Sequence, residues 1–207
     1  HPKGGYNGGI SSYDAGVTAL ALLAFAGRGD THQEGRYREV SAKGLRWLLA
    51  QQKQDGKIGL EHGETIYNHA VATMALCELY GLSGDAKLRG PAERALSFCL
   101  QAQNPGLGWK YGVRPGKNDT SVTTWMTLAL DAGQQAGLSV PEEAFAGARR
   151  WFQRVTDSRG HVGYMTPGGG SSFIASQDGK FDILPVMNGS ALLARVLAGE
   201  EAKTLTR

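Results

Sequence analysis

A short pattern that ends in a tight turn recurs three times in this chain of 207 residues. Each copy places an aromatic residue in a predicted helix, one or two glutamines near the end of that helix, and then a turn that contains glycine. The turn glycines Gly56, Gly106 and Gly160 are roughly 50 residues apart, and such a period indicates a repeat protein whose units bury apolar faces against one another. The copies span Trp47–Gly59, Phe98–Trp109 and Trp151–Gly163.

Two kinds of helix alternate along the chain. The first kind is apolar almost all round, which requires protein on every side, and the second has one apolar stripe, as in a surface helix. The alternation predicts an all-α fold of about three and a half hairpins, each with a buried inner helix and a half-exposed outer helix. The inner helices are expected at Ser11–Gly27, Tyr67–Tyr80, Asp119–Ala136 and Asn188–Gly199, and the outer helices at Arg38–Gln54, Pro91–Gln103 and Ser139–Thr156.

Polar residues and prolines predict where several helices begin. Ser11 or Ser12 is expected to cap the first helix, because a hydroxyl there can accept a free N–H of the first turn. Pro91 is expected near the first turn of its helix. Ser139-Val-Pro-Glu142 has the spacing of a capping box.

Composition excludes some classes of function. The net charge is only +3 and the basic residues are spread along outer helices, so a nucleic-acid or membrane-surface role is not indicated. The longest apolar run, Val17–Ala26, has about half the length of a membrane-spanning helix, and no signal peptide is retained. We therefore expect a soluble chain, and the sequence does not indicate its cellular location. The chain starts at His1 without Met, which suggests a piece of a longer protein and contacts with its other domains. Cys77 and Cys99 are expected to be buried thiols, with a disulfide as the alternative.

The helix pairs and their turns resemble the repeats of the squalene–hopene cyclase and protein prenyltransferase superfamily. Gly106-Leu-Gly-Trp109, which follows two glutamines, is closest to its Gln/Trp motif, whereas Ile58 and Val162 stand in the place of the Trp. The resemblance extends over roughly residues 11 to 199 and is strongest to bacterial proteins with prenyltransferase or squalene-cyclase repeats. It implies an α/α toroid, here an incomplete or small ring, in which inner helices surround an axis and outer helices surround them.

The resemblance also implies a domain plan. The whole chain, 1–207, is expected to be a single α/α-toroid repeat domain. Its repeats are expected at roughly 11–59, 67–112 and 119–165, with a half repeat at 186–200.

The catalytic motifs of that superfamily are missing from this sequence. The cyclases protonate their substrate with Asp-x-Asp-Asp, and the prenyltransferases hold zinc with an Asp-x-Cys pair and a His. The chain has no such acidic run, and neither Cys77 nor Cys99 has an Asp two residues before it. The Gly-Cys-Gly-Glu-Gln sequence of the related complement domains is also absent. The histidines lack the tight spacing of metal ligands, so we expect neither a metal nor a cofactor.

Polar and aromatic residues at the starts of the inner helices form the candidate ligand site. The long loops of the chain end at these helix starts, and free N–H groups there suit a polar or anionic group. The alternative is that these residues are ordinary helix caps. The candidates are Tyr13, Asp14, Tyr67, His69, Asp119 and Thr120, together with Tyr111 and Arg114 in the loop before Asp119.

Two classes of function therefore remain. The favoured one is a non-catalytic repeat domain that binds a protein, a glycan or a lipid-like ligand at the N-terminal end of the inner helices. The alternative is an enzyme on the same scaffold, terpenoid-cyclase-like or acting as a lyase or hydrolase on a carbohydrate. In that case Asp14, His69 and Asp119 would supply acid–base groups.

Overall fold

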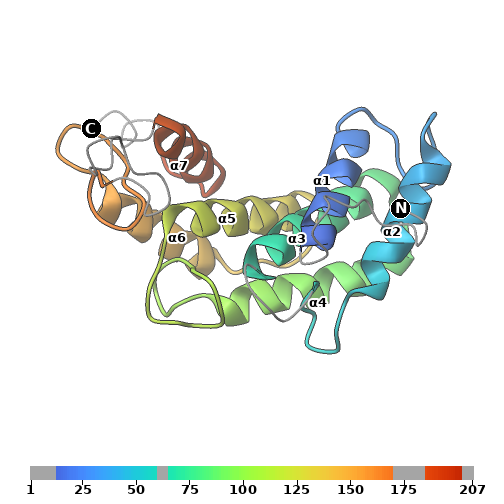
Figure 1. Cartoon of the computed structure of the whole chain (residues 1–207), viewed down its shortest axis with the longest axis horizontal. Coiled ribbons are helices and arrows are strands. Elements are labelled where there is room, and N and C mark those ends of the chain that lie inside the picture. The colour runs from blue at the N-terminus through green and yellow to red at the C-terminus, as the bar shows by residue number, and fades with distance from the viewer. Residues whose placement is uncertain (1–12, 60–64, 170–184, 202–207) are drawn as a thin grey trace. The chain divides into compact units, whose positions relative to one another are not determined.

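The computed structural model describes residues 13–59, 65–169 and 185–201, which form seven helices and no strand (Figure 1). The predicted all-α class is thus confirmed, while the expected caps Ser11 and Ser12 lie outside the described residues. In that part of the chain no helix combines the length and the hydropathy that crossing a membrane requires. The helices are α1 (Asp14–Ala26), α2 (Arg38–Ala50), α3 (Thr65–Ser83), α4 (Ala86–Ala102), α5 (Thr120–Gln135), α6 (Glu142–Val155) and α7 (Pro185–Leu197).

The chain divides into two compact units. The first unit comprises His1–Gln101 and Ala129–Val140, and the second comprises Ala102–Leu128 and Pro141–Arg207. Helix α5 contributes its N-terminal part to the second unit and its C-terminal part to the first.

Helix α3 is the buried centre of the first unit. It packs on α1, and α1 also contacts α2. Close packing of α1 on α3 depends on Gly16, since a Cβ atom there would collide with the side-chain oxygen of Asn68. The buried apolar residues of α3 come from every side of the helix, as its composition predicts, and they include Ile66, Ala70, Val71, Ala72, Ala75, Leu76 and Leu79.

The three outer helices bury one stripe each, as predicted. In α6 the buried side chains recur at helical spacing and face the core, whereas Glu142, Glu143 and Arg150 are exposed. Helices α2 and α4 follow the same plan, with Leu45 and Leu48 buried in the former and Leu88, Ala92 and Leu96 in the latter. Amphipathic periodicity therefore placed these helices correctly.

The prediction of complete burial is wrong for α1 and α7. Leu20 of α1 is 48% exposed, and in α7 Val186, Leu192, Leu193 and Val196 are 48–61% exposed. These are the first and last helices that the structure describes, and α7 packs on α6 while α1 packs on α2 and α3. The composition of a helix does not report on how many sides it has neighbours.

Two helix starts differ from the sequence-based expectation. Helix α4 begins at Ala86, so Pro91 lies inside the helix rather than in its first turn. Helix α6 begins at Glu142 after Pro141, and no side chain caps it, so the expected capping box does not form. Pro141 has φ −65° and ψ 132°, and this extended backbone already ends the preceding segment.

The three repeat turns share one backbone pattern. In each, an N–H at the end of the outer helix donates to the carbonyl oxygen four residues later: Lys53 to Lys57 at 2.8 Å, Asn104 to Gly108 at 3.0 Å, and Asp157 to His161 at 2.9 Å. Gly56, Gly106 and Gly160 all have positive φ, 90°, 67° and 82°, a backbone conformation that favours glycine. Counted from these donors, Gly56, Leu107 and Gly160 occupy the same position in their turns. Gly106 lies one position before Leu107.

The next inner helix supplies a hydrogen-bond acceptor to each turn. The Ile58 N–H donates to His69 Nδ1 at 3.1 Å, the Trp109 N–H to Thr123 Oγ1 at 3.0 Å, and the Val162 N–H to Asn188 Oδ1 at 2.7 Å. These N–H groups occupy the same place in their turns. The polar residues that interrupt α3, α5 and α7 therefore have a structural task in common, performed by three residue types.

A glutamine joins each of the first two turns to the next outer helix. Gln52 Nε2 donates to the Pro91 carbonyl at 2.8 Å, and Gln103 Nε2 donates to the Ala144 carbonyl at 2.9 Å. Both amides also reach a carbonyl of their own turn, that of Gly56 or Leu107. In the third turn this position is Thr156, whose hydroxyl donates to Phe152 of its own helix.

Candidate functional site

The eight candidate residues fall into the two compact units. Tyr13, Asp14, Tyr67 and His69 belong to the first unit, and Tyr111, Arg114, Asp119 and Thr120 belong to the second. Each group is described below within its own unit.

Two candidates of the first unit lie at the start of α1. Tyr13 precedes α1 without forming a side-chain cap and is 39% exposed. Asp14 opens the helix, and its Oδ1 is buried without a hydrogen-bond partner. Tyr67, in the first turns of α3, is half-buried.

His69 is fully buried and both ring nitrogens are engaged. Because Nδ1 accepts from Ile58, the proton resides on Nε2, which lies 3.1 Å from the Ala95 carbonyl oxygen and 3.4 Å from Cys99 Sγ. Burial lowers the pKa of His69 to about 4, against the opposing effect of its hydrogen bond to Ala95. A neutral, enclosed imidazole of this kind holds the turn against α3 and α4.

The two cysteines lie in the same unit. Cys77 and Cys99 are buried free thiols, as expected, and no disulfide joins them. Burial raises the pKa of Cys99 to about 12 and that of Cys77 further still. Neither thiol is therefore a nucleophile near neutral pH.

In the second unit, Asn104 organises the loop that leads to α5. Its side-chain amide donates to the Lys117 carbonyl at 2.7 Å and to Asn118 Oδ1 at 2.9 Å, and its own oxygen accepts from the Gly116 N–H at 2.8 Å. Arg114, which lies in this loop between Asn104 and Gly116, is exposed and has φ 46°. It is the only non-glycine residue with positive φ in the described ranges. The loop is thus closed on itself by one buried side chain.

Asp119 caps α5 and is fully buried. Its Oδ1 accepts from the Val122 N–H at 2.8 Å and from the Ser121 hydroxyl at 2.9 Å. Its Oδ2 is buried without a partner of good hydrogen-bonding geometry. Burial raises the pKa of Asp119, while the Val122 N–H, Ser121, Lys110 and Tyr164 each act to lower it. The cap interpretation therefore accounts for Oδ1, and the role of Asp119 in a ligand site stays a prediction.

Thr120 and two tyrosines bring a second segment of the unit to the start of α5. Thr120 donates through its hydroxyl to the Gly163 carbonyl at 2.6 Å and through its N–H to the Tyr164 carbonyl at 2.9 Å. This fixes Tyr164, whose hydroxyl lies 3.1 Å from that of Tyr111. Tyr164 is buried and Tyr111 is half-buried, and Tyr164 is close enough to Asp119 to lower the pKa of its carboxyl group. We call Tyr111, Asp119 and Tyr164 the α5 site.

A cavity of about 230 Å³ is lined in part by residues that neighbour the α5 site in sequence. Asn118 precedes Asp119, and Met165 follows Tyr164 and lies 2.7 Å from Lys110 Nζ. The lining combines apolar surface from an indole, a leucine and a thioether with an amide and two cations. Its residues are Leu107, Gly116, Lys117, Asn118, Trp151, Arg154 and Met165.

The structure brings together three of the eight sequence candidates, Tyr111, Asp119 and Thr120, and adds Tyr164. Tyr164 follows the third repeat turn directly, and this aromatic position was the available signal for it. The arrangement combines two tyrosine hydroxyls with one buried carboxyl group. No protein-family model matches the chain, and no curated protein matches it by sequence.

Proposed function

We propose that this chain is a non-catalytic helical-repeat domain that binds a glycan at the α5 site and its adjoining cavity. The observation that carries the proposal is the tyrosine pair, with hydroxyls 3.1 Å apart, beside the buried carboxyl of Asp119. Sugar hydroxyls both donate and accept hydrogen bonds, and aromatic rings pack on the apolar faces of a sugar. The cavity supplies both kinds of surface through Trp151 and Asn118.

Binding can be measured by calorimetry on the intact chain with neutral and acidic oligosaccharides. Tyr111→Phe removes one hydroxyl from the half-buried end of the pair, and we expect the affinity to fall by about fivefold to tenfold, the effect of one hydrogen bond. Tyr80→Phe, at a half-buried tyrosine of the first unit, is the matched control and should leave the affinity unchanged. Absence of binding to every oligosaccharide tested would refute the proposal, and equal losses in both variants would place the ligand elsewhere.

We further propose that the hairpins form an arc of an α/α toroid of the squalene–hopene cyclase type. Two observations support this arrangement: buried and half-exposed helices alternate from α2 to α6, and the same hydrogen bonds recur in successive turns. Pairs of spin labels, one on each unit, would test it by distance measurement. Distances that fit no common axis for α3 and α5 would contradict the toroid.

A second candidate function, an enzyme acting on a carbohydrate, is favoured by one observation. The raised pKa of Asp119 suits a general acid. Incubation with oligosaccharides and analysis for shortened or unsaturated products tests this candidate. Asp119→Asn, which retains an oxygen for the cap, should abolish product formation if Asp119 is the acid, whereas persistent turnover in this variant would exclude that role.

A further inference from the structure

The largest cavity described here, about 360 Å³, lies in the first unit against one face of α2. Three of its lining side chains are cationic, Arg38, Lys43 and Arg46, and one, Glu39, is acidic. Arg38 and Arg46 lie two helical turns apart, so they are on the same face of the helix. The cavity therefore has an excess of positive charge.

These three cations differ from three other helix-borne arginines of the described residues. In the described residues, the side chains of Arg38, Lys43 and Arg46 form no hydrogen bond or ion pair, although each lies on an exposed helical face. By contrast, Arg89, Arg149 and Arg150 each pair with a glutamate of their own helix. Unpaired cations that converge on one cavity are more informative than cations spread over a solvated face.

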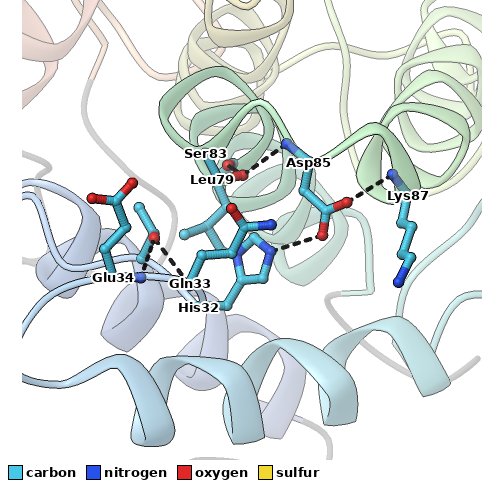
Figure 2. Close-up of polar contacts among 8 residues, drawn as sticks. His32, Gln33, Glu34, Leu79, Ser83, Asp85 and Lys87 are labelled. Atoms are coloured by element: carbon cyan, nitrogen blue, oxygen red, sulfur yellow. Dashed lines mark hydrogen bonds and ion pairs between the residues drawn. The ribbon is translucent and has the colours of Figure 1, made fainter.

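The fourth positively chargeable group of the cavity, His32, is held in place. Its Nε2 lies 3.0 Å from Asp85 Oδ2, and Figure 2 shows the two side chains pointing toward each other. Asp85 is itself fixed at the start of α4 by the N–H of Lys87, at 3.0 Å from Oδ1. His32 Nδ1 is buried without a partner. His32 therefore forms a fixed part of the cavity wall, and the donors to a ligand are the three cations.

The loop that carries His32 is fixed by its own hydrogen bonds. Asp30 accepts from the Tyr37 N–H at 3.2 Å and from Arg28 Nε at 3.0 Å. The Thr31 hydroxyl accepts from the N–H groups of Gln33 and Glu34, both at 3.1 Å. A wall that is fixed before the ligand arrives lowers the entropic cost of binding.

We infer that this cavity binds a tetrahedral oxyanion, a phosphate or sulfate group carried by a small molecule. Two arginines and a lysine can provide charge-assisted hydrogen bonds to several oxygens of such a group, and arginine does so with two parallel donors. The cavity is larger than the anion alone, so the rest of the molecule has room. This site is separate from the α5 site, and its test does not depend on glycan binding.

The test uses the intact chain and four probes: pyrophosphate, inorganic sulfate, glucose 6-phosphate and glucose 6-sulfate. We expect saturable binding at one site by calorimetry, and the two sugar esters distinguish phosphate from sulfate as the natural group. Arg38→Gln combined with Arg46→Gln should weaken binding by at least about tenfold, the effect of a lost charge-assisted bond. Lys43→Gln alone should weaken binding by a smaller factor. Both variants replace exposed side chains with polar ones, so folding should be retained.

Arg159→Gln is the matched control, because it removes one exposed positive charge from a repeat turn of the second unit. It should change the affinity by less than about twofold, since exposed charges at a distance are screened by salt. Equal weakening in Arg159→Gln and in the cavity variants would show a general effect of net charge and overturn the inference. The inference would also be overturned if none of the four probes showed saturable binding. Binding to polyglutamate, in the absence of binding to the four probes, would overturn it as well.

Discussion

The turn after α2 and the turn after α4 form the same hydrogen bonds, but they differ in where the glycine lies that allows turn and outer helix to approach closely. In the first case the glycine is in the turn: a Cβ on Gly56 would collide with the backbone carbonyl of Arg94 in α4. In the second turn the corresponding residue is Leu107, and the glycine is Gly147 of α6, where a Cβ would lie 2.6 Å from the Leu107 carbonyl oxygen. In each turn, one partner thus lacks a Cβ where it faces the backbone of the other.

The hydrogen-bond acceptors of the two turns differ in a related way. His69 has a long side chain, so it accepts from the Ile58 N–H while the turn backbone stays far enough from α3 to carry Lys57, which corresponds to Gly108. Thr123 is short, so the chain must come closer to α5, and a Cβ on Gly108 would lie 2.9 Å from Thr123 Cγ2. A short acceptor therefore goes with a glycine and a long acceptor goes with an ordinary residue. The two turns thus form the same hydrogen bond with two different pairs of residues.

The largest expected effect is that of Gly56→Ala. This variant combines a positive φ of 90° with the collision against Arg94, and we expect it to lower the free energy of unfolding by about 3 kcal/mol. Gly160→Ala is the control, because Gly160 has φ 82° but nothing within 4 Å of its added Cβ. It should cost only about 1 kcal/mol. Equal losses in urea denaturation would show that backbone strain alone explains Gly56.

Acid should distinguish the two turns next. The unfolded chain protonates His69 near its ordinary pKa of 6.5 and the folded chain only near 4, so stability is complete above pH 6.5 and falls as the pH decreases towards 4. The full loss is about 3 kcal/mol. Thr123 does not titrate, so hydrogen exchange, corrected for intrinsic rates, should show Ile58 losing protection before Trp109. Similar loss at both amides, or an unchanged pH profile in His69→Asn, would contradict this.

Removal of the acceptor in the second turn should have a smaller effect. Thr123→Val keeps the shape of the side chain but leaves the buried Trp109 N–H without its partner, at an expected cost of about 1.5 kcal/mol. Thr127→Val is matched to it, because the Thr127 hydroxyl donates only to the Thr123 carbonyl of its own helix. In thermal unfolding, Thr127→Val should lose much less stability than Thr123→Val. A larger loss in Thr127→Val would contradict the proposed role of Thr123.

The smallest effect is expected from the glutamine that joins turn to outer helix. Gln52→Met retains the length of the side chain and loses the bonds to the Pro91 and Gly56 carbonyls, at a cost of about 1 kcal/mol because these groups are partly accessible to water. Thr156→Val at the third turn should cost less, since Thr156 bonds only within its own helix. A larger cost for Thr156→Val in chemical denaturation would refute this ranking.

The sequence predicted the elements that depend on local patterns. The helical class, the amphipathic outer helices and the positive φ of the turn glycines all follow from residue spacing and from the lack of a Cβ. The offset of Gly106 was not predictable from the glycines alone, because it depends on the backbone bond from the Asn104 N–H to Gly108. The exposure of α7 was missed because an apolar composition does not state which neighbours are present.

The candidate site could be predicted only in part, for a similar reason. Polar residues at the starts of inner helices were recognised, but a sequence does not show which of them serve a turn. His69 is enclosed with both nitrogens in use, whereas Asp119 has one oxygen engaged in the cap and one without a partner. This difference lies in three-dimensional contacts between segments far apart in the chain, such as Tyr111 and Tyr164.

The close approach of turn and outer helix also restricts how such chains can diverge. A Cβ on Gly56 would meet the backbone carbonyl group of Arg94, and a Cβ on Gly147 would meet the backbone carbonyl oxygen of Leu107. Because every residue type carries that carbonyl group, no substitution of Arg94 or Leu107 can make room for a side chain on the glycine opposite. A side chain at Gly56 or Gly147 would therefore require the backbone of turn and helix to move apart.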